Sequence, residues 1–187
     1  MKDTFPFLVF FCLIIMQRVL ELIVARNNEK WLKERGAIEF GKEHYRYMVL
    51  MHVVFFISLF CEKLFLNRVH TSYWPLLLLV FFIAQAIRIW AISSLGKFWN
   101  TKIIVLPNAS VVRKGPYRFI KHPNYVVVSV ELIVIPMLFG AYLTTCLFTI
   151  FNMMILSIRI PFEEKALSSL THYQGVFQSC NRFLPKL

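Results

Sequence analysis

The sequence predicts an all-α integral membrane protein with about five transmembrane helices. Of its 187 residues 58% are hydrophobic, whereas soluble domains use roughly 45–50% apolar residues. The mean hydropathy of +0.60 points the same way. The apolar residues also gather into runs that approach the roughly 17–25 residues needed to span a membrane. These runs, of which the second and fourth are short, are Phe5–Ala25, Tyr47–Cys61, Tyr73–Leu95, Tyr125–Phe139 and Tyr142–Ile160.

The positive charges follow the loops between these predicted spans, within a net charge of +11. Sixteen cations lie between spans one and two, between spans three and four, or from the end of span five onward, whereas the alternate loops hold only Lys2, Lys63 and Arg68. The positive-inside rule therefore predicts an outward N-terminus and a cytoplasmic C-terminus. Attraction to anionic membrane lipids accounts for the charge, so we expect no nucleic-acid partner.

The first apolar run is expected to stay as a transmembrane helix rather than to be removed as a secretory signal. It is too long for a signal, Asp3 dilutes its basic end, and no small-x-small cleavage motif precedes Arg26. The four cysteines are scattered, without a C-x-x-C pair or a histidine at ligand spacing. The sequence therefore predicts neither a disulfide framework nor a metal site.

The polar segments between the spans predict structure at the membrane surface. Residues 26–46 mix four glutamates with basic residues, which suits a helix lying on the cytoplasmic surface and a turn at Gly36. Residues 101–113 set two β-branched runs around Pro107, Asn108 and Ala109, a hairpin signal. We expect hairpin or irregular structure there.

Prolines and glycines set the expected limits of the last two spans. Pro123 disfavours the helical conformation at His122, so the fourth helix is expected to begin at Asn124, whose side chain can cap its first turn. Residues 139–141 leave room only for a tight antiparallel hairpin between spans four and five. Pro161 is expected to end the fifth helix and to start a separate interfacial helix over residues 161–170.

Several polar side chains fall inside the apolar runs, where a charge costs at least ~2.5–3.5 kcal/mol. They are Arg18, Glu21, Gln85, Arg88, Glu131, Asn152 and Arg159. Ion pairing that holds the bundle together is one interpretation and is preferred for Arg18 with Glu21. Arg159 lies four residues before Glu163 where the fifth span leaves the membrane, so this pair can be either an ion pair or part of a site.

The second half of the chain resembles the isoprenylcysteine carboxyl methyltransferase family and its bacterial relatives. The resemblance covers residues 96–187. It is carried by a G-P-Y-x-x-x-[KR]-H-P-x-Y segment before one helix, an R-x-x-x-E-E segment after a helical hairpin, and the aromatic tail "HYQGVFQSCNRFLPKL". The residues in the two segments are Gly115, Pro116, Tyr117, Lys121, His122, Pro123, Tyr125, Arg159, Glu163 and Glu164. It divides the chain into transmembrane helices over residues 1–95 and a methyltransferase core over residues 96–187.

This resemblance implies an S-adenosylmethionine-dependent methyltransferase with a cofactor site on the cytosolic face, formed by the loop before helix four and the C-terminal helix. The lipophilic acceptor then enters from the bilayer. The cofactor-binding residues that it implies are Val111, Val112, Tyr117, His122, Pro123, Asn124, Tyr125 and Glu163. It assigns Arg159 to the acceptor, as the catalytic residue.

The chemistry of these residue types agrees with the implied roles. Glu163 can take the cofactor's ammonium group, and the free amides at the start of helix four can take its carboxylate. Tyr117 and Tyr125 offer aromatic faces to the adenine or the sulfonium. An acidic acceptor needs only a cation such as Arg159 to orient it, whereas a weakly acidic hydroxyl or an amine needs a base, for which His122 or Glu131 is the nearest candidate.

The family often has glycine after H-P-x-Y, but this chain has Val126, Val127 and Val128. We therefore widen the expected acceptor from isoprenylcysteine to any hydrophobic molecule with a carboxylate or acidic hydroxyl, such as a long-chain polyketide. The alternatives are a phospholipid N-methyltransferase, an NADPH-dependent membrane reductase of the sterol-reductase type, and a non-enzymatic transporter or scaffold. The oligomeric state stays open.

Overall fold

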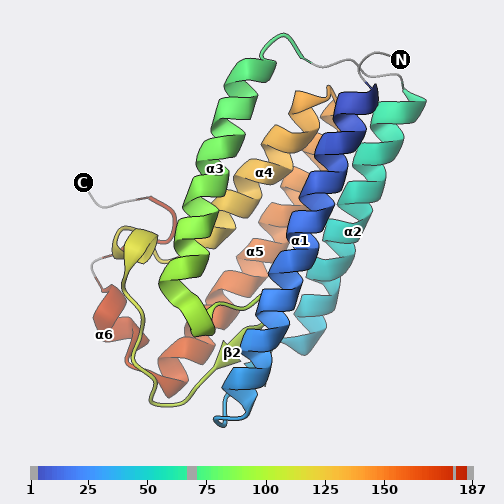
Figure 1. Ribbon diagram of the computed structural model, residues 1–187. Coiled ribbons are helices and arrows are strands. Elements are labelled where there is room, and N and C mark those ends of the chain that lie inside the picture. The colour runs from blue at the N-terminus through green and yellow to red at the C-terminus, as the bar shows by residue number, and fades with distance from the viewer. Residues whose placement is uncertain (1–3, 67–70, 179, 185–187) are drawn as a thin grey trace.

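The computed structural model describes residues 4–66, 71–178 and 180–184. Three cations counted above, Lys2, Arg68 and Lys186, lie outside these residues. Five helices pack side by side: α1 (Thr4–Lys33), α2 (Lys42–Phe65), α3 (Trp74–Leu95), α4 (Pro123–Leu138) and α5 (Tyr142–Leu170). Figure 1 shows α4 and α5 behind α1 and α3, with the short helix α6 (Tyr173–Phe177) and the strands at the lower end.

Four of these helices are long and apolar enough to cross a membrane, namely α1, α2, α5 and α3 with the 3-10 turn that extends it to Phe98. Helix α4 is apolar but has 16 residues, which corresponds to roughly 24 Å of helix. The prediction of a helical multi-pass membrane protein is confirmed. The fifth span and the division of the chain at residue 95 stay predictions.

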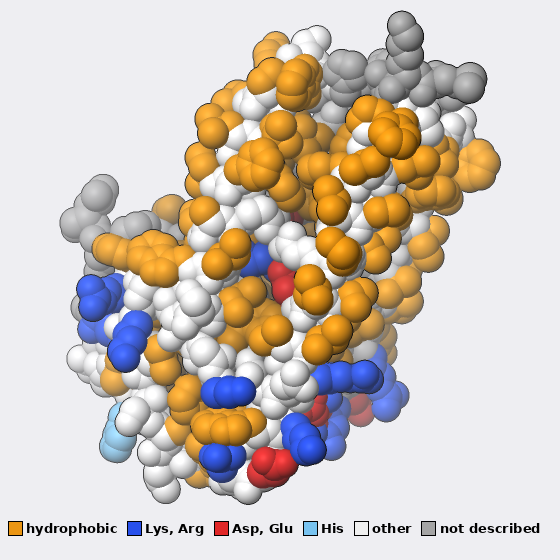
Figure 2. All heavy atoms as spheres, viewed as in Figure 1, with side chains coloured by type: hydrophobic (Ala, Val, Ile, Leu, Met, Phe, Trp, Pro, Cys, Tyr) orange, Lys and Arg blue, Asp and Glu red, His pale blue; other side chains and the backbone are white. Residues whose placement is uncertain are grey.

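The outer faces of the bundle are apolar, and its interior is filled by aromatic and aliphatic side chains. Figure 2 shows hydrophobic side chains over most of one face and Lys and Arg side chains gathered at its lower end. Inside, Phe7 packs edge-on against Phe139 with ring centroids 4.9 Å apart, and Phe55 meets Phe148 at 5.4 Å. Outward apolar surface is what a lipid environment accommodates, because lipid tails are as apolar as leucine.

Residues 26–46 differ from the expected surface helix. Helix α1 continues without a break to Lys33, and the chain then turns at Gly36, whose φ of 83° confirms the predicted turn. Ile38–Phe40 (β1) next pairs antiparallel with Ile103–Val105 (β2). The expected surface helix is therefore wrong. The fold is mostly helical as predicted, but it also contains a two-stranded sheet.

The predicted hairpin or irregular structure over residues 101–113 proves to be one strand followed by an irregular segment, so the hairpin alternative is wrong. The first β-branched run is β2, while Val111 and Val112 have no regular structure. The chain turns away at Asn108, which has a positive φ of 58° and donates its amide to the carbonyl of Leu170 at 2.9 Å. Because this bond directs the chain toward α5, the second run cannot return to pair with the first.

Helix α4 begins at Pro123, one residue before the predicted start, and no side-chain cap closes it. Proline suits the first helical position because it has no amide proton to satisfy. The expected Asn124 cap is therefore wrong, and Asn124 Oδ1 is buried without a partner in the described part of the chain. The tight hairpin between α4 and α5, through residues 139–141, is confirmed.

Helix α5 does not end at Pro161, so the predicted separate interfacial helix is wrong. An interior proline costs roughly 3 kcal/mol because it leaves a carbonyl unpaired and crowds the preceding turn. Both Pro161 and Ser157, whose carbonyl loses its helical partner, lie on the exposed side of α5. Because Arg159, Ile160 and Ala166 are buried on the other side, packing keeps the helix continuous through Pro161.

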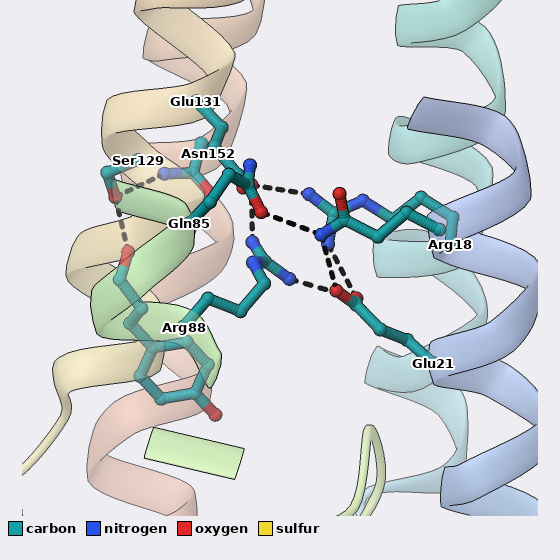
Figure 3. A network of polar contacts seen from close by, with 9 residues as sticks. Arg18, Glu21, Gln85, Arg88, Ser129, Glu131 and Asn152 are labelled. Atoms are coloured by element: carbon teal, nitrogen blue, oxygen red, sulfur yellow. Dashed lines mark hydrogen bonds and ion pairs between the residues drawn. The ribbon is translucent and has the colours of Figure 1, made fainter. Parts of the chain in front are cut away.

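Five of the seven polar side chains predicted inside the spans, all but Asn152 and Arg159, join into one network across α1, α3 and α4 (Figure 3). Arg18 donates to Glu21 at 2.7 Å and also to Glu131, and Arg88 donates to the same two carboxylates, at 2.9 Å for Glu21. Gln85 donates to Glu131 at 2.7 Å. The Arg18–Glu21 pair is confirmed, and Glu131 has a packing role within this larger network.

Gly115 opens the 3-10 turn before α4, and we predict that Gly115→Ala destabilises the fold. Its φ is +55°, and an added Cβ would lie 2.0 Å from Ser94 Oγ and 2.8 Å from Trp90 Nε1. The left-handed backbone alone costs about 1–2 kcal/mol, and Ser94 must also move. Thermal unfolding in detergent measures the loss.

Gly36→Ala is the matched control for Gly115→Ala. Gly36 also has a positive φ but has nothing within 4 Å of an added Cβ. The Gly115 variant should therefore unfold at a lower temperature than the Gly36 variant. Equal unfolding temperatures would show that the contact with Ser94 adds nothing to the loss of stability.

Candidate active site

The predicted site residues converge on one cavity of about 770 Å³. It extends from apolar side chains of α1 and α2 to the loop after α3 and the inner side of α5. Eight of the nine predicted residues line it: Val111, Val112, Tyr117, His122, Asn124, Tyr125, Arg159 and Glu163. Pro123 does not, since it is fully buried at the start of α4. The volume is within the ~300–1,000 Å³ of ligand pockets.

Arg159 and Glu163 are connected through a tyrosine rather than by a direct ion pair. Arg159 Nε donates to Tyr125 Oη at 2.8 Å, and Tyr125 Oη donates to the Glu163 carboxylate. Arg159 Nη2 donates to the carbonyl of Thr101 at 2.6 Å. The phenol from α4 thus stands between a cation and an acid that both come from α5.

Five residues that line the cavity have a buried polar atom without a hydrogen-bond partner in the described part of the chain. The atoms are Arg88 Nε, Trp99 Nε1, Asn124 Oδ1, Arg159 Nη1 and Tyr173 Oη. An unsatisfied buried polar group costs about 1–3 kcal/mol, more when it is charged. The hydrogen-bonding capacity of these cavity-lining side chains is therefore not fully used within the described residues.

Glu164, the neighbour of Glu163, has a different position and is not among the cavity-lining residues. It accepts a hydrogen bond from Arg182 Nη2 at 2.7 Å and pairs with His122 Nε2 at 3.1 Å. Hydrogen bonding to Glu164 raises the pKa of Arg182, so that this cation stays charged. Glu164 therefore ties the tail to the loop before α4, a link extended by the amide of Lys121, which donates to the Asn181 carbonyl at 3.0 Å.

The wall beside Glu163 is aromatic. Tyr117, Tyr173 and Phe177 are buried together with Ala91 and Cys180, and the first three line the cavity. Burial, with the negative charge of Glu163, raises the pKa of the Tyr117 phenol well above its ordinary value. Tyr117 is therefore neutral at physiological pH and offers an aromatic face next to a carboxylate.

Sequence reasoning missed Thr101, Tyr173 and Phe177 as individual site residues. Thr101 contributes through its backbone carbonyl, which any residue type carries, so no sequence signal marks it. Tyr173 and Phe177 fall in the aromatic tail of the family resemblance, and their spacing of four residues places them on one face of α6. That spacing next to R-x-x-x-E-E was the available signal.

Comparison with known proteins agrees with this geometry. A sequence model of the isoprenylcysteine carboxyl methyltransferase family matches residues 76–169. The uncharacterized protein YpbQ of Bacillus subtilis is 50% identical over 155 residues, which cover 83% of this chain and 92% of that protein. An uncharacterized protein of Haemophilus influenzae is 31% identical over 163 residues, 86% of this chain and 94% of its own. The chain belongs to the isoprenylcysteine carboxyl methyltransferase family and is a multi-pass membrane protein.

Proposed function

We propose that the protein is an S-adenosylmethionine-dependent methyltransferase that acts on a carboxylate or acidic hydroxyl of a hydrophobic, membrane-dissolved molecule. Family membership already indicates a membrane methyltransferase. The observation that carries the finer proposal is the Arg159–Tyr125–Glu163 chain in the wall of one cavity. It presents a cation and an acid, fixed relative to each other, to two different ligands.

The cofactor end of the cavity is proposed to lie around Glu163, where the available groups fit S-adenosylmethionine. When bound, this cofactor supplies an electrophilic methyl group on a sulfonium. The Glu163 carboxylate can hold its ammonium group, and the first-turn amides of α4 can hold its carboxylate. Asn124 Oδ1, buried without a partner in the described structure, can accept from an amino group, and the neutral Tyr117 ring can cover the adenine.

The acceptor end is proposed to lie at Arg159. Its Nη1 group has no partner among the described residues, while Nε and Nη2 are anchored to Tyr125 and Thr101. Arg159 can therefore orient an acceptor oxygen without moving itself, which is how aligned reactants gain rate. Phe11, Phe56 and Phe60 line the same cavity and suit the acceptor's apolar chain.

An acidic acceptor is favoured over an amine by the state of the two candidate bases. His122 pairs with Glu164, and Glu131 takes hydrogen bonds from Arg18, Arg88 and Gln85. An ionised oxygen needs no base, whereas an ammonium group must lose a proton before methylation. A phospholipid N-methyltransferase is therefore the weaker reading of this site.

The proposed topology has five spans, with the N-terminus outside and the site on the cytosolic side. This arrangement is supported by the Lys and Arg side chains at the end of the bundle that carries the strands (Figure 2). The partners are then the membrane lipids, a cytosolic cofactor, and a lipophilic acceptor that enters from the bilayer.

The direct test is to incubate purified protein with methyl-labelled S-adenosylmethionine and a total lipid extract, and to identify the labelled product. We expect label in a methyl ester or methyl ether of a hydrophobic molecule. Label on the amine of phosphatidylethanolamine would replace the proposal by N-methylation. Binding of NADPH but not of S-adenosylmethionine would indicate a reductase instead.

Arg159→Lys is predicted to slow methyl transfer by about one to two orders of magnitude. Lysine keeps the charge but loses the planar fork with which arginine bonds Tyr125, Thr101 and the acceptor at once. Cofactor affinity should change little because Glu163 remains. Turnover and cofactor binding are measured on one preparation. Wild-type turnover would remove Arg159 from the acceptor site, and loss of cofactor binding would make it a support for Glu163.

A further inference from the structure

A ring of polar side chains lines the cavity at a second level, deeper in the bundle than Arg159. We call the cavity-lining members the polar belt: Arg18, Glu21, His52, Arg88 and Asn152. They come from α1, α2, α3 and α5. The proposed methyl transfer at Arg159 uses none of them, and polar groups at membrane depth are costly unless they serve packing or a ligand.

Hydrogen bonds to Thr101 show how far the polar belt lies from Arg159 along the axes of α5 and α2. Arg159 Nη2 bonds the Thr101 carbonyl, and the Tyr45 hydroxyl lies 3.3 Å from Thr101 Oγ1. Tyr45 and Arg159 therefore share one level. Asn152 and His52 each lie two helical turns deeper on the same faces, about 10 Å along the axes.

The depth on α1 follows in the same way. Asn100, the neighbour of Thr101, donates its side-chain amide to the Ala25 carbonyl at 3.0 Å. Arg18 precedes Ala25 by two helical turns, which again gives about 10 Å. Arg88 is bonded to Glu21 of α1 at 2.9 Å and so belongs to this level. The cavity thus has a polar end and, about 10 Å deeper, a polar belt.

The Arg and Glu members are paired among themselves (Figure 3), but His52 and Asn152 are not part of those pairs. His52 Nδ1 lies 2.8 Å from the Met48 carbonyl. Because a carbonyl only accepts, Nδ1 carries the proton and Nε2 of the neutral ring keeps a free lone pair. Asn152 Nδ2 donates to Ser129 at 2.9 Å. His52 Nε2 and Asn152 Oδ1 have no partner in the described part of the chain.

Arg18 supplies the complementary donors. The contacts to Glu21 and Glu131 engage two of its five N–H groups. Its side chain is 21% exposed and lines the same cavity as His52. A group that both donates and accepts would satisfy His52 Nε2 and Arg18 together. A hydroxyl does this, whereas a methylene leaves both unsatisfied.

We infer that the polar belt binds a second oxygen function of the methyl acceptor, a hydroxyl about 10 Å from the group held at Arg159. The inference rests on the proposed function, since it places the acceptor in this cavity. It narrows the acceptor class from any lipophilic acid to one with a hydroxyl partway along its chain. The hydroxyl donates to His52 Nε2 and accepts from Arg18.

The test measures binding of a saturated long-chain fatty acid and of its positional isomers with a single hydroxyl, by calorimetry on the full-length protein in nanodiscs. The isomer whose hydroxyl lies about 10 Å from the carboxylate should bind about tenfold more tightly than the unsubstituted acid. His52→Phe should abolish this preference, because the phenyl ring offers no hydrogen-bond acceptor to the hydroxyl. His52→Gln, which keeps an acceptor, should retain part of it.

His44→Phe is the matched control, because His44 also lies on α2 but is not among the cavity-lining residues. It should keep the full preference. Equal affinity of the wild type for all isomers, or binding of none, would overturn the inference. The polar belt would then bind no hydroxyl of the acceptor. The same follows if His52→Phe keeps the preference. Methyl transfer is measured in a separate assay. If the hydroxylated isomer binds more tightly but no methyl transfer occurs, the result contradicts the proposed function and not this inference.

Discussion

Replacing Arg88 with methionine is expected to destabilise the bundle by about 3–5 kcal/mol, the largest effect that we predict. Arg88 and Glu131 are each 2% exposed at the centre of the network, and Arg88 also bonds Glu21. The substitution leaves two carboxylates facing Arg18 alone, with one uncompensated charge in an apolar interior. The unfolding temperature in detergent should fall by roughly 6–20 °C.

Two further variants separate charge imbalance from lost packing. Arg26→Met removes an exposed arginine from α1 and should leave the unfolding temperature nearly unchanged. The double variant Arg88→Met with Glu131→Gln restores the charge balance and should recover part of the loss. If Arg88→Met unfolds at the wild-type temperature, the network does not hold α1 to α3 and α4.

Glu163→Gln is expected to weaken S-adenosylmethionine binding by roughly 10- to 150-fold, because it removes a charge-assisted bond worth about 1.5–3 kcal/mol. The amide keeps the size of the carboxylate and still accepts from Tyr125, so the fold should persist. Calorimetric titration of the purified variant with the cofactor measures the change.

Glu164→Gln is the matched control for Glu163→Gln, since the two acids are adjacent but only Glu163 lines the cavity. We expect a smaller loss of affinity, with loosening of the tail as its bonds to Arg182 and His122 weaken. Unchanged affinity in Glu163→Gln would contradict the proposed cofactor site. A larger loss in Glu164→Gln would mean that the tail, rather than Glu163, dominates binding.

The features that the sequence could predict depend on local patterns. Apolar length identified the long helices, and three residues between two apolar runs allowed only a hairpin. The spacing of the motif residues grouped eight of nine predicted positions around one cavity, although their roles stay predictions. Each of these follows from chain geometry over a few turns.

The missed features depend on contacts between distant segments. The four-residue spacing of Arg159 and Glu163 allowed a direct ion pair, but Tyr125 from another helix lies between them. Helix α5 continues through Pro161, which lies on its exposed side, and a sequence does not show which way a helix faces. The strand Ile103–Val105 pairs with Ile38–Phe40, far earlier in the chain.

The bond between the tail and the loop before α4 has a consequence for biosynthesis. Tyr173 and Phe177 line the cavity. The carbonyls of Asn181 and Arg182 accept hydrogen bonds from the backbone amides of Lys121 and His122. All four residues follow the five helices in the chain, and N-terminal elements leave the ribosome first. The helices can therefore insert and associate while the pocket is still open on this side. The contacts that close the pocket on this side can form only after translation has passed residue 182.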